Sequence, residues 1–233
     1  MASYLPVLPG IHPPNHSPDY RSTALRAPHL PPVRLPADAL EYAGPEVGAA
    51  RLRPGGSDLT ANGLAQGQRI LIHGRISDER GCPVTHSLVE IWQANAAGRY
   101  RHDGDRHDAP LDPHFTGAGQ VLTNANGEYE FLSIEPGAYP WGNHANAWRP
   151  KHVHFSLFGP AWASRLVTQM YFEGDPLLPL DPIFMSVPDA AARQRLVATF
   201  DLSRTQPAFA LAWRFDIVLR GPQDTPFETA AHG

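Results

Sequence analysis

Two short runs on either side of a turn decide the fold: Arg69-Ile70-Leu71-Ile72-His73-Gly74-Arg75-Ile76, then Asp78-Glu79-Arg80-Gly81, then Ser87-Leu88-Val89-Glu90-Ile91-Trp92-Gln93. The first run is rich in isoleucine, and apolar and polar residues alternate along the second, as in a strand with one buried face. Asp and Gly are typical of the tight turns that end strands. The pattern therefore predicts β strands over 69–76 and 87–93.

Similar short runs continue toward the C-terminal end. They are Glu128–Phe131 after the turn Asn124–Gly127, then His152–Leu157, Leu166–Phe172 and Arg214–Leu219. Short strands separated by Gly, Pro and Asn predict an all-β protein with a β-sandwich core. One short helix is expected over 189–197, because Asp189 follows Pro188 and can cap a helix.

Proline divides the chain into two regions. There are 25 prolines among 233 residues, about twice the usual ~5%. Eight of them lie between Pro9 and Pro36, which favours extended backbone that cannot close a core by itself. We therefore expect residues 1–66 to form an extended N-terminal arm that packs on the core or on a partner, and residues 67–233 to form the β-sandwich domain.

Charge and composition exclude several classes of protein. The net charge is −4, and no stripe of Lys and Arg offers a surface for nucleic acid or an anionic membrane. No apolar run approaches the ~20 residues that span a bilayer. Cys82 is the single cysteine, which fits a reducing compartment. The residues from Met1 to Pro6 do not have the pattern of a secretory signal, so a cytoplasmic protein is expected.

The first candidate for chemistry is the pair His152 and His154. Residues i and i+2 of a strand project from the same face, so both imidazoles can reach one metal ion. Taken alone, such a pair more often forms a half-exposed polar face. Tyr100 and Tyr139 lie in loops marked by Gly and Pro, where a rigid scaffold can present side chains. A tyrosine in such a place ordinarily fills an apolar corner, so these four residues gain weight only as a set.

Longer motifs support the interpretation of these four residues as one site. They are Glu90-Ile91-Trp92-Gln93-Ala94-Asn95, Gly98-Arg99-Tyr100-Arg101-His102, Pro136-Gly137-Ala138-Tyr139-Pro140-Trp141, Trp148-Arg149-Pro150-Lys151-His152-Val153-His154-Phe155, Gln169-Met170-Tyr171-Phe172-Glu173-Gly174-Asp175-Pro176 and Arg214-Phe215-Asp216-Ile217-Val218-Leu219-Arg220-Gly221. In this order they resemble the intradiol aromatic-ring dioxygenases. The resemblance runs from Pro18-Asp19-Tyr20 to the end of the chain.

The resemblance implies one non-haem Fe(III) per chain, held by Tyr100, Tyr139, His152 and His154. The chemistry of these donors agrees, because two anionic phenolate oxygens favour Fe(III) over Fe(II) and imidazole suits iron generally. A bound cation can also deprotonate a phenol whose free pKa is near 10. The set differs from the two-histidine, one-carboxylate triad of ferrous oxygenases.

The implied reaction is the opening of a catechol ring by O2 between its two hydroxylated carbons. The metal acts as a Lewis acid and template, and the tyrosine matching Tyr139 leaves it on substrate binding and takes up protons. Arg149 lies in the position of the family's arginine, where a fixed cation would stabilise charge developing on the ring. The implied substrate pocket contains Tyr20, Trp141, Gln169 and Ile183, with Tyr20 meeting a ring carboxylate.

The proline-rich arm favours one branch of the family. The single-subunit branches begin with a helical dimerisation region, which this arm cannot form. The branch that cleaves protocatechuate (3,4-dihydroxybenzoate) to 3-carboxy-cis,cis-muconate pairs its iron-carrying chain with an iron-free α subunit of similar fold, and this arrangement is expected. Two alternatives stay open: the same chemistry on catechol, hydroxyquinol or a chlorinated ring, and a β-sandwich binding module without catalysis.

A second polar cluster could be mistaken for a metal site. Its members are His102, Asp103, Asp105, His107 and Asp108. Their spacing matches no face of a strand or helix, so a solvated loop is expected. His107 stands where related chains often carry tyrosine, and Gly142 stands where many carry a larger residue. Gly142 is expected to alter the shape of the pocket, and His144 is expected near its entrance.

Overall fold

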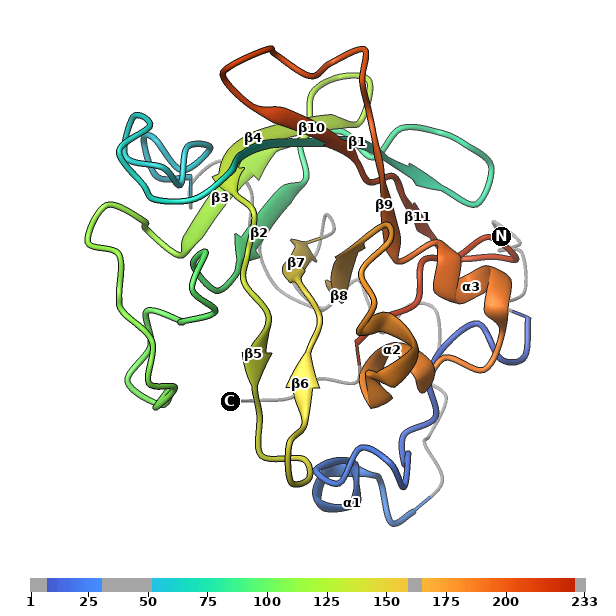
Figure 1. The fold of residues 1–233 in the computed structure, drawn as a ribbon. Coiled ribbons are helices and arrows are strands. Elements are labelled where there is room, and N and C mark those ends of the chain that lie inside the picture. The colour runs from blue at the N-terminus through green and yellow to red at the C-terminus, as the bar shows by residue number, and fades with distance from the viewer. Residues whose placement is uncertain (1–7, 31–51, 159–164, 229–233) are drawn as a thin grey trace.

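The computed structural model describes residues 8–30, 52–158 and 165–228, which form two layers of β-sheet (Figure 1). One layer contains β4 (Glu128–Ile134), β1 (Arg69–Asp78) and β10 (Leu211–Arg214), with β11 (Ile217–Leu219) beside the end of β1. The other contains β3 (Ala118–Leu122), β2 (Leu88–Trp92), β7 (His152–Phe158) and β8 (Arg165–Phe172). β9 (Val197–Phe200) pairs with both β10 and β8 and so joins the layers at one edge.

The main core lies between the layers. On β7, Val153 and Phe155 point into it and are 0% exposed. Phe131 of β4 meets Phe155 from the opposite layer, with ring centroids 6.0 Å apart. Burying one such phenylalanine contributes about 1.5–3 kcal/mol. Because side chains alternate along a strand, the same register turns His152 and His154 to the outer face of this layer.

The predicted all-β class and sandwich are confirmed, but the last predicted strand is wrong as a single element. β10 ends at Arg214 and β11 begins at Ile217. Between them, Asp216 uses its side-chain oxygen to accept the hydrogen bond from the Arg75 backbone N–H (2.9 Å). The backbone also crowds β1 here, since a Cβ on Gly74 would lie 1.8 Å from the Phe215 carbonyl oxygen.

The expected helix is present and shorter. α3 spans Ala190–Gln194, and Asp189 caps it by accepting from the Ala192 backbone N–H (2.6 Å). Val197 already belongs to β9. The expected number of helices, one, is too low. The structure also contains α1 (Thr23–Arg26), α2 (Pro182–Met185) and the 3₁₀ turn Leu178–Leu180. It also adds strands that the sequence reading missed: β3, β9 and the small hairpin of β5 (Tyr139–Pro140) and β6 (Trp148–Arg149).

The described part of the arm packs on the core. Ile11 is 3% exposed and joins an apolar cluster with Tyr171, Phe184 and Leu196. The proline-rich segment 31–36 lies outside the described residues. Leu59, which falls within the predicted arm, is part of the main core, and the division of the chain at residue 66 stays a prediction. Among the residues described, no helix has the length and hydropathy needed to cross a membrane.

Candidate metal centre

Strand register gathers polar groups on the outer face of the second layer. In the antiparallel pair of β7 and β8, His152 lies opposite Tyr171 and His154 lies opposite Gln169. On the other side, Trp92 of β2 lies opposite His154. The Trp92 and His154 rings stack with centroids 4.8 Å apart and an interplanar angle of 4°. The indole therefore fixes the plane of the His154 imidazole.

Hydrogen bonds define which nitrogen of each imidazole carries the proton. His152 Nδ1 lies 2.7 Å from the Pro150 carbonyl oxygen, and His154 Nδ1 lies 3.2 Å from Glu228 Oε2. Both partners accept only, so both Nδ1 atoms must donate. Each Nε2 is then the nitrogen with a lone pair, and each faces the tyrosine hydroxyls. This is the tautomer that a metal requires of both histidines.

A tight loop after β2 places Tyr100. The Asn95 side chain accepts from the backbone N–H groups of Ala97 and Arg99, both at 2.9 Å. The Asn95 carbonyl oxygen accepts from the Gly137 N–H (2.9 Å), in the segment that leads to Tyr139. Asn95 is 4% exposed. One buried residue thus ties together the two segments that carry the tyrosines.

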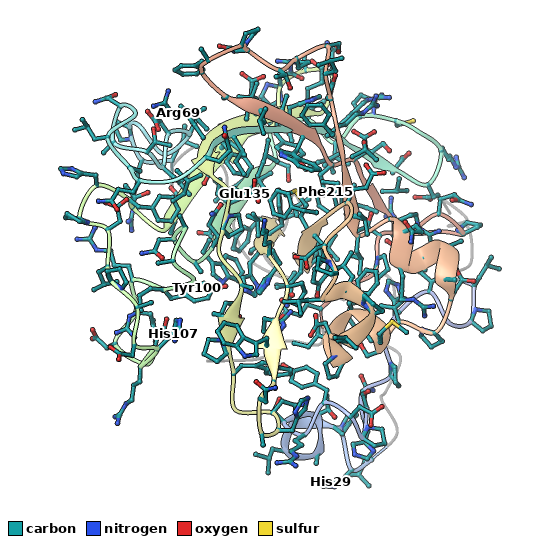
Figure 2. All side chains as sticks on the ribbon, viewed as in Figure 1. His29, Arg69, Tyr100, His107, Glu135 and Phe215 are labelled. Atoms are coloured by element: carbon teal, nitrogen blue, oxygen red, sulfur yellow. The ribbon has the colours of Figure 1, made fainter. Side chains whose placement is uncertain are left out.

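Tyr139 lies on the hairpin of β5 and β6, where it pairs with Arg149. The hairpin extends away from the sheets toward α1, and the loop that contains Tyr100 and His107 lies beside it (Figures 1 and 2). The Tyr100 and Tyr139 rings meet edge to face, with centroids 5.3 Å apart and an angle of 87°. The hairpin therefore brings a second phenol to the first.

The two glycines between these segments allow the close approach. A Cβ on Gly98, whose φ is +77°, would lie 2.3 Å from the Ala138 carbonyl oxygen. A Cβ on Gly137 would lie 2.5 Å from the Ala96 carbonyl oxygen. Any side chain at either position would push the tyrosine-bearing segments apart.

Replacing Gly98 with alanine should therefore weaken the fold and separate the two phenols. We expect the left-handed φ to cost about 1–2 kcal/mol and the contact with Ala138 to cost about 1–3 kcal/mol more. Gly81→Ala is the matched control, because Gly81 has a φ of +78° and open space around the added Cβ. Thermal unfolding and iron per chain should both fall further for Gly98→Ala. Equal losses in the two variants would contradict the packing role.

The four predicted ligand side chains converge. His152 Nε2 lies 3.4 Å from the Tyr100 hydroxyl and 3.3 Å from the Tyr139 hydroxyl. His154 Nε2 lies 3.2 Å from the Tyr100 hydroxyl. Donor atoms ~2.0–2.1 Å from one ion stand about 3.3 Å apart in a tetrahedral set. The spacing and the donor chemistry therefore fit a single metal ion.

Burial decides the charge of these groups in the metal-free protein. Burial, with the neighbouring Tyr139, raises the pKa of Tyr100 well above 10.0. Burial also raises the pKa of Tyr139, although Arg149 and the hydrogen bond with Tyr100 act in the opposite direction. Desolvation, then Arg149, lowers the pKa of His152 well below 6.5. Both phenols are therefore protonated and His152 is neutral at pH 7, so loading a metal displaces the phenol protons.

Arg149 is a buried cation beside the predicted ligands. It is 3% exposed, and its Nε lies 3.0 Å from Asp181 Oδ1. Its guanidinium also donates to Gln169 Oε1 (2.5 Å) and to the Tyr171 hydroxyl (3.3 Å). Burial lowers the pKa of Arg149, but the nearby Asp181 carboxylate outweighs this effect and raises the pKa well above its usual range. The site therefore contains a permanent positive charge.

A cavity of about 810 Å³ opens over these groups. Its walls include Tyr100, Tyr139, His154 and Arg149 together with the predicted substrate residues Tyr20, Trp141 and Ile183. The Tyr20 and Trp141 rings meet edge to face at 5.5 Å, which places the arm at the cavity. Gln169 is different: it is 2% exposed, lies behind Arg149 and lines a separate small pocket with Tyr171.

The expectation of a merely solvated loop around His107 is partly wrong. Asp105 is half-buried and accepts from the Tyr100 backbone N–H (2.7 Å), so it helps to place Tyr100. His102 and Asp103 are exposed, as expected. His144 is also exposed, and its Nδ1 lies 2.8 Å from the Ala145 carbonyl oxygen. A Cβ on Gly142 would meet nothing within 4 Å, so that position has room for a larger side chain.

The site residues missed in the sequence reading include Asn95, Tyr171, Asp181 and Glu228. Asn95 and Tyr171 stood inside quoted motifs without an assigned role. Asp181 could have been suspected from the Asp-Pro pair that starts α2, but not as the partner of Arg149. Nothing in the local sequence around Glu228 indicates that the C-terminal segment returns to His154.

Comparison with known proteins agrees with this geometry. Residues 44–221 match the family model described as "Dioxygenase", and residues 8–37 match the one described as "Protocatechuate 3,4-dioxygenase beta subunit N terminal". The chain belongs to the intradiol ring-cleavage dioxygenase family. The predicted family, enzyme class and ring-cleaving activity are thus confirmed. Intradiol dioxygenases generally use non-haem iron, which agrees with the donor set.

The chain is more similar to some intradiol dioxygenases than to others. The chain is 55% identical over 221 residues to the protocatechuate 3,4-dioxygenase beta chain of Burkholderia cepacia, with 93% of this chain and 94% of that chain covered. It is 35% identical to catechol 1,2-dioxygenase 1 of Acinetobacter lwoffii, over 57% of this chain and 45% of that one. The solved 3-chlorocatechol 1,2-dioxygenase of Rhodococcus opacus 1CP shares the fold, at a TM-score of 0.56 and 22% identity over 80% of this chain and 69% of that chain.

Proposed function

We propose that this intradiol dioxygenase carries one Fe(III), held by Tyr100, Tyr139, His152 and His154, and cleaves protocatechuate with O2 to 3-carboxy-cis,cis-muconate. The observation that carries the proposal is the convergence of four donor atoms at 3.2–3.4 Å with both Nδ1 atoms engaged elsewhere. The 55% identical relative is named for protocatechuate, which supports the choice of substrate.

A ferric ion held by Tyr100, Tyr139, His152 and His154 would supply Lewis acidity that makes a bound catechol ring reactive toward O2. The protein supplies the remaining functions. Burial raises the pKa of Tyr139. As a phenolate, this residue would therefore take up a proton readily and could accept one from the incoming catechol. Its place beside Arg149 keeps the phenolate oxygen within the site.

Arg149 would stabilise negative charge that develops on the ring. It is held by Asp181 and Gln169, so its guanidinium needs no reorganisation during the reaction. Trp141, with the guanidinium carbon 5.3 Å from its ring centre, forms a flat wall against which an aromatic substrate can lie. Arg149 is itself buried, so its interaction with developing charge is stronger than it would be in water.

We also propose that the chain pairs with an iron-free α subunit of similar fold. The relative from Burkholderia cepacia is named a beta chain, and the arm matches the N-terminal model of such subunits. The test is co-expression with a candidate α subunit, followed by iron analysis and oxygen uptake. We expect a burgundy complex that consumes O2 with protocatechuate far faster than with catechol. Equal rates on the two substrates would overturn the protocatechuate assignment, and a colourless, iron-free complex would favour a binding module.

Tyr20 should distinguish substrates by their carboxylate. It is 3% exposed, and it lines the cavity from the arm. Tyr20→Phe would remove one hydrogen bond to a charged group, worth about 1.5–3 kcal/mol, or roughly 10–100-fold in KM. Steady-state kinetics with the complex should show this rise for protocatechuate and little change for catechol, the internal control. An equal rise for both substrates would show that Tyr20 does not read the carboxylate.

A further inference from the structure

A buried carboxylate from the C-terminal segment contacts one of the proposed ligands. Glu228 Oε2 lies 3.2 Å from His154 Nδ1, and the Glu228 side chain is 7% exposed. The carboxylate lines the same cavity as Tyr100, Tyr139 and Arg149. None of the steps above uses it. A buried acid without a role in the reaction calls for an account of what it does there.

The backbone around Glu228 is fixed to β8. The Glu228 N–H donates to the Val167 carbonyl oxygen (2.7 Å), and the Thr168 hydroxyl donates to the Pro226 carbonyl oxygen (2.6 Å). Thr168 is 0% exposed. The position of the carboxylate is therefore fixed by a backbone segment that is hydrogen-bonded to β8.

The N-terminal arm closes over the same segment. His12 Nδ1 accepts from the Phe227 backbone N–H (3.3 Å), so His12 Nε2 carries the proton and donates to Asp224 Oδ2 (3.0 Å). The His12 ring also stacks on Phe227, with centroids 4.3 Å apart and an angle of 25°. Arg195 donates to the Asp224 carbonyl oxygen (2.9 Å). His12 of the arm therefore binds the C-terminal segment at Asp224 and at Phe227, the residue directly before Glu228.

The two proposed histidine ligands differ in what faces their outer nitrogen. His152 donates to a neutral backbone carbonyl, while His154 donates to a carboxylate. A carboxylate behind a metal-bound imidazole fixes its ring, specifies its tautomer and increases its basicity. His154 also has its ring plane set by Trp92. Stacking alone does not select which imidazole nitrogen carries the proton. The carboxylate selects it and also makes the imidazole a stronger electron donor to a metal.

We propose that Glu228 is a positioning residue that orients His154 and strengthens it as an iron ligand. The proposal rests on the proposed function, because it concerns the iron of that site. A stronger imidazole donor places more electron density on the ferric ion and lowers its Lewis acidity. Loss of the charge should therefore loosen the iron and move the tyrosinate-to-iron charge-transfer band to lower energy.

The test compares Glu228→Gln and Glu228→Ala with the wild-type complex. Glutamine keeps the size and an acceptor oxygen but removes the charge, whereas alanine removes both. Iron remaining after dialysis against a chelator should fall in the order wild type, Glu228→Gln, Glu228→Ala, with affinity lower by about 10–100-fold for the alanine variant. The charge-transfer band should shift to longer wavelength in both variants. Glu173→Gln is the matched control, because Glu173 is exposed.

Each outcome decides between distinct claims. If wild type contains iron and its band, but Glu228→Gln matches wild type in both iron retention and band position, the positioning role is overturned and the proposed function stands. A variant that is less stable to heat with an unchanged band would give Glu228 a structural role and also overturn the proposal. A wild-type complex without iron would overturn the proposed function as well. Should the alanine variant fail to fold, Glu228→Gln decides the matter.

Discussion

Replacing His152 with alanine is expected to abolish both iron binding and ring cleavage. His152 Nε2 lies within 3.4 Å of both tyrosine hydroxyls, so its loss removes a donor that is close to both phenols. Removing a supporting residue typically costs 10–100-fold in metal affinity, and we expect the loss of a ligand to exceed about 100-fold. Iron per chain and oxygen uptake by the complex measure the two effects.

A histidine outside the site provides the control. His144→Ala changes the same residue type at the tip of the β5–β6 hairpin, where the side chain is exposed. This variant should retain iron and activity. His152→Ala that still contains one iron per chain, with wild-type oxygen uptake, would contradict the ligand assignment. Circular dichroism of both variants distinguishes lost binding from lost folding.

The second large effect should come from Arg149. Arg149→Met removes the cation and leaves Asp181, which is 0% exposed, as an uncompensated buried charge. Breaking a buried ion pair in this way costs about 3–5 kcal/mol of stability. Loss of a preorganised charge at the reacting ring should also lower kcat by about 10²–10³. Chemical denaturation and steady-state kinetics would measure the two losses separately.

A double variant separates the two roles of Arg149. In Arg149→Met/Asp181→Asn both charges are gone, while the asparagine oxygen can still accept from the N-terminal N–H groups of α2 as Asp181 does. We expect stability to recover toward wild type and kcat to stay low, with iron retained. If kcat recovered together with stability, Arg149 would have only a structural role.

Much of the fold follows from local patterns in the sequence. The alternation in His152–Leu157 predicts both the strand and the shared face of His152 and His154, because the period of a strand is fixed. The break between Arg214 and Ile217 does not follow in this way. It depends on the close approach of Phe215 to Gly74 and on Asp216 bonding to Arg75, and these are contacts between residues about 140 positions apart.

The residues of the site differ in the same way: some follow from local sequence, and others depend on long-range contacts. Tyr100, Tyr139, His152 and His154 stand inside long family motifs, so the sequence indicates them directly. Asp181 contacts Arg149, and Glu228 contacts His154. The partners lie 32 and 74 positions apart in the sequence. Burial gives these two carboxylates their importance, and burial at a given position depends on how β8, α2 and the C-terminal segment pack.

Resonance Raman spectroscopy of the purified complex, with iron quantified per chain, tests whether both tyrosines bind a ferric ion. We expect one ferric ion per chain and tyrosinate vibrations enhanced by excitation in the visible band. These vibrations should weaken in Tyr100→Phe and in Tyr139→Phe, because each variant removes one phenolate. A complex that contains iron but has no tyrosinate vibrations, or whose spectrum is unchanged by both substitutions, would contradict the four-residue site.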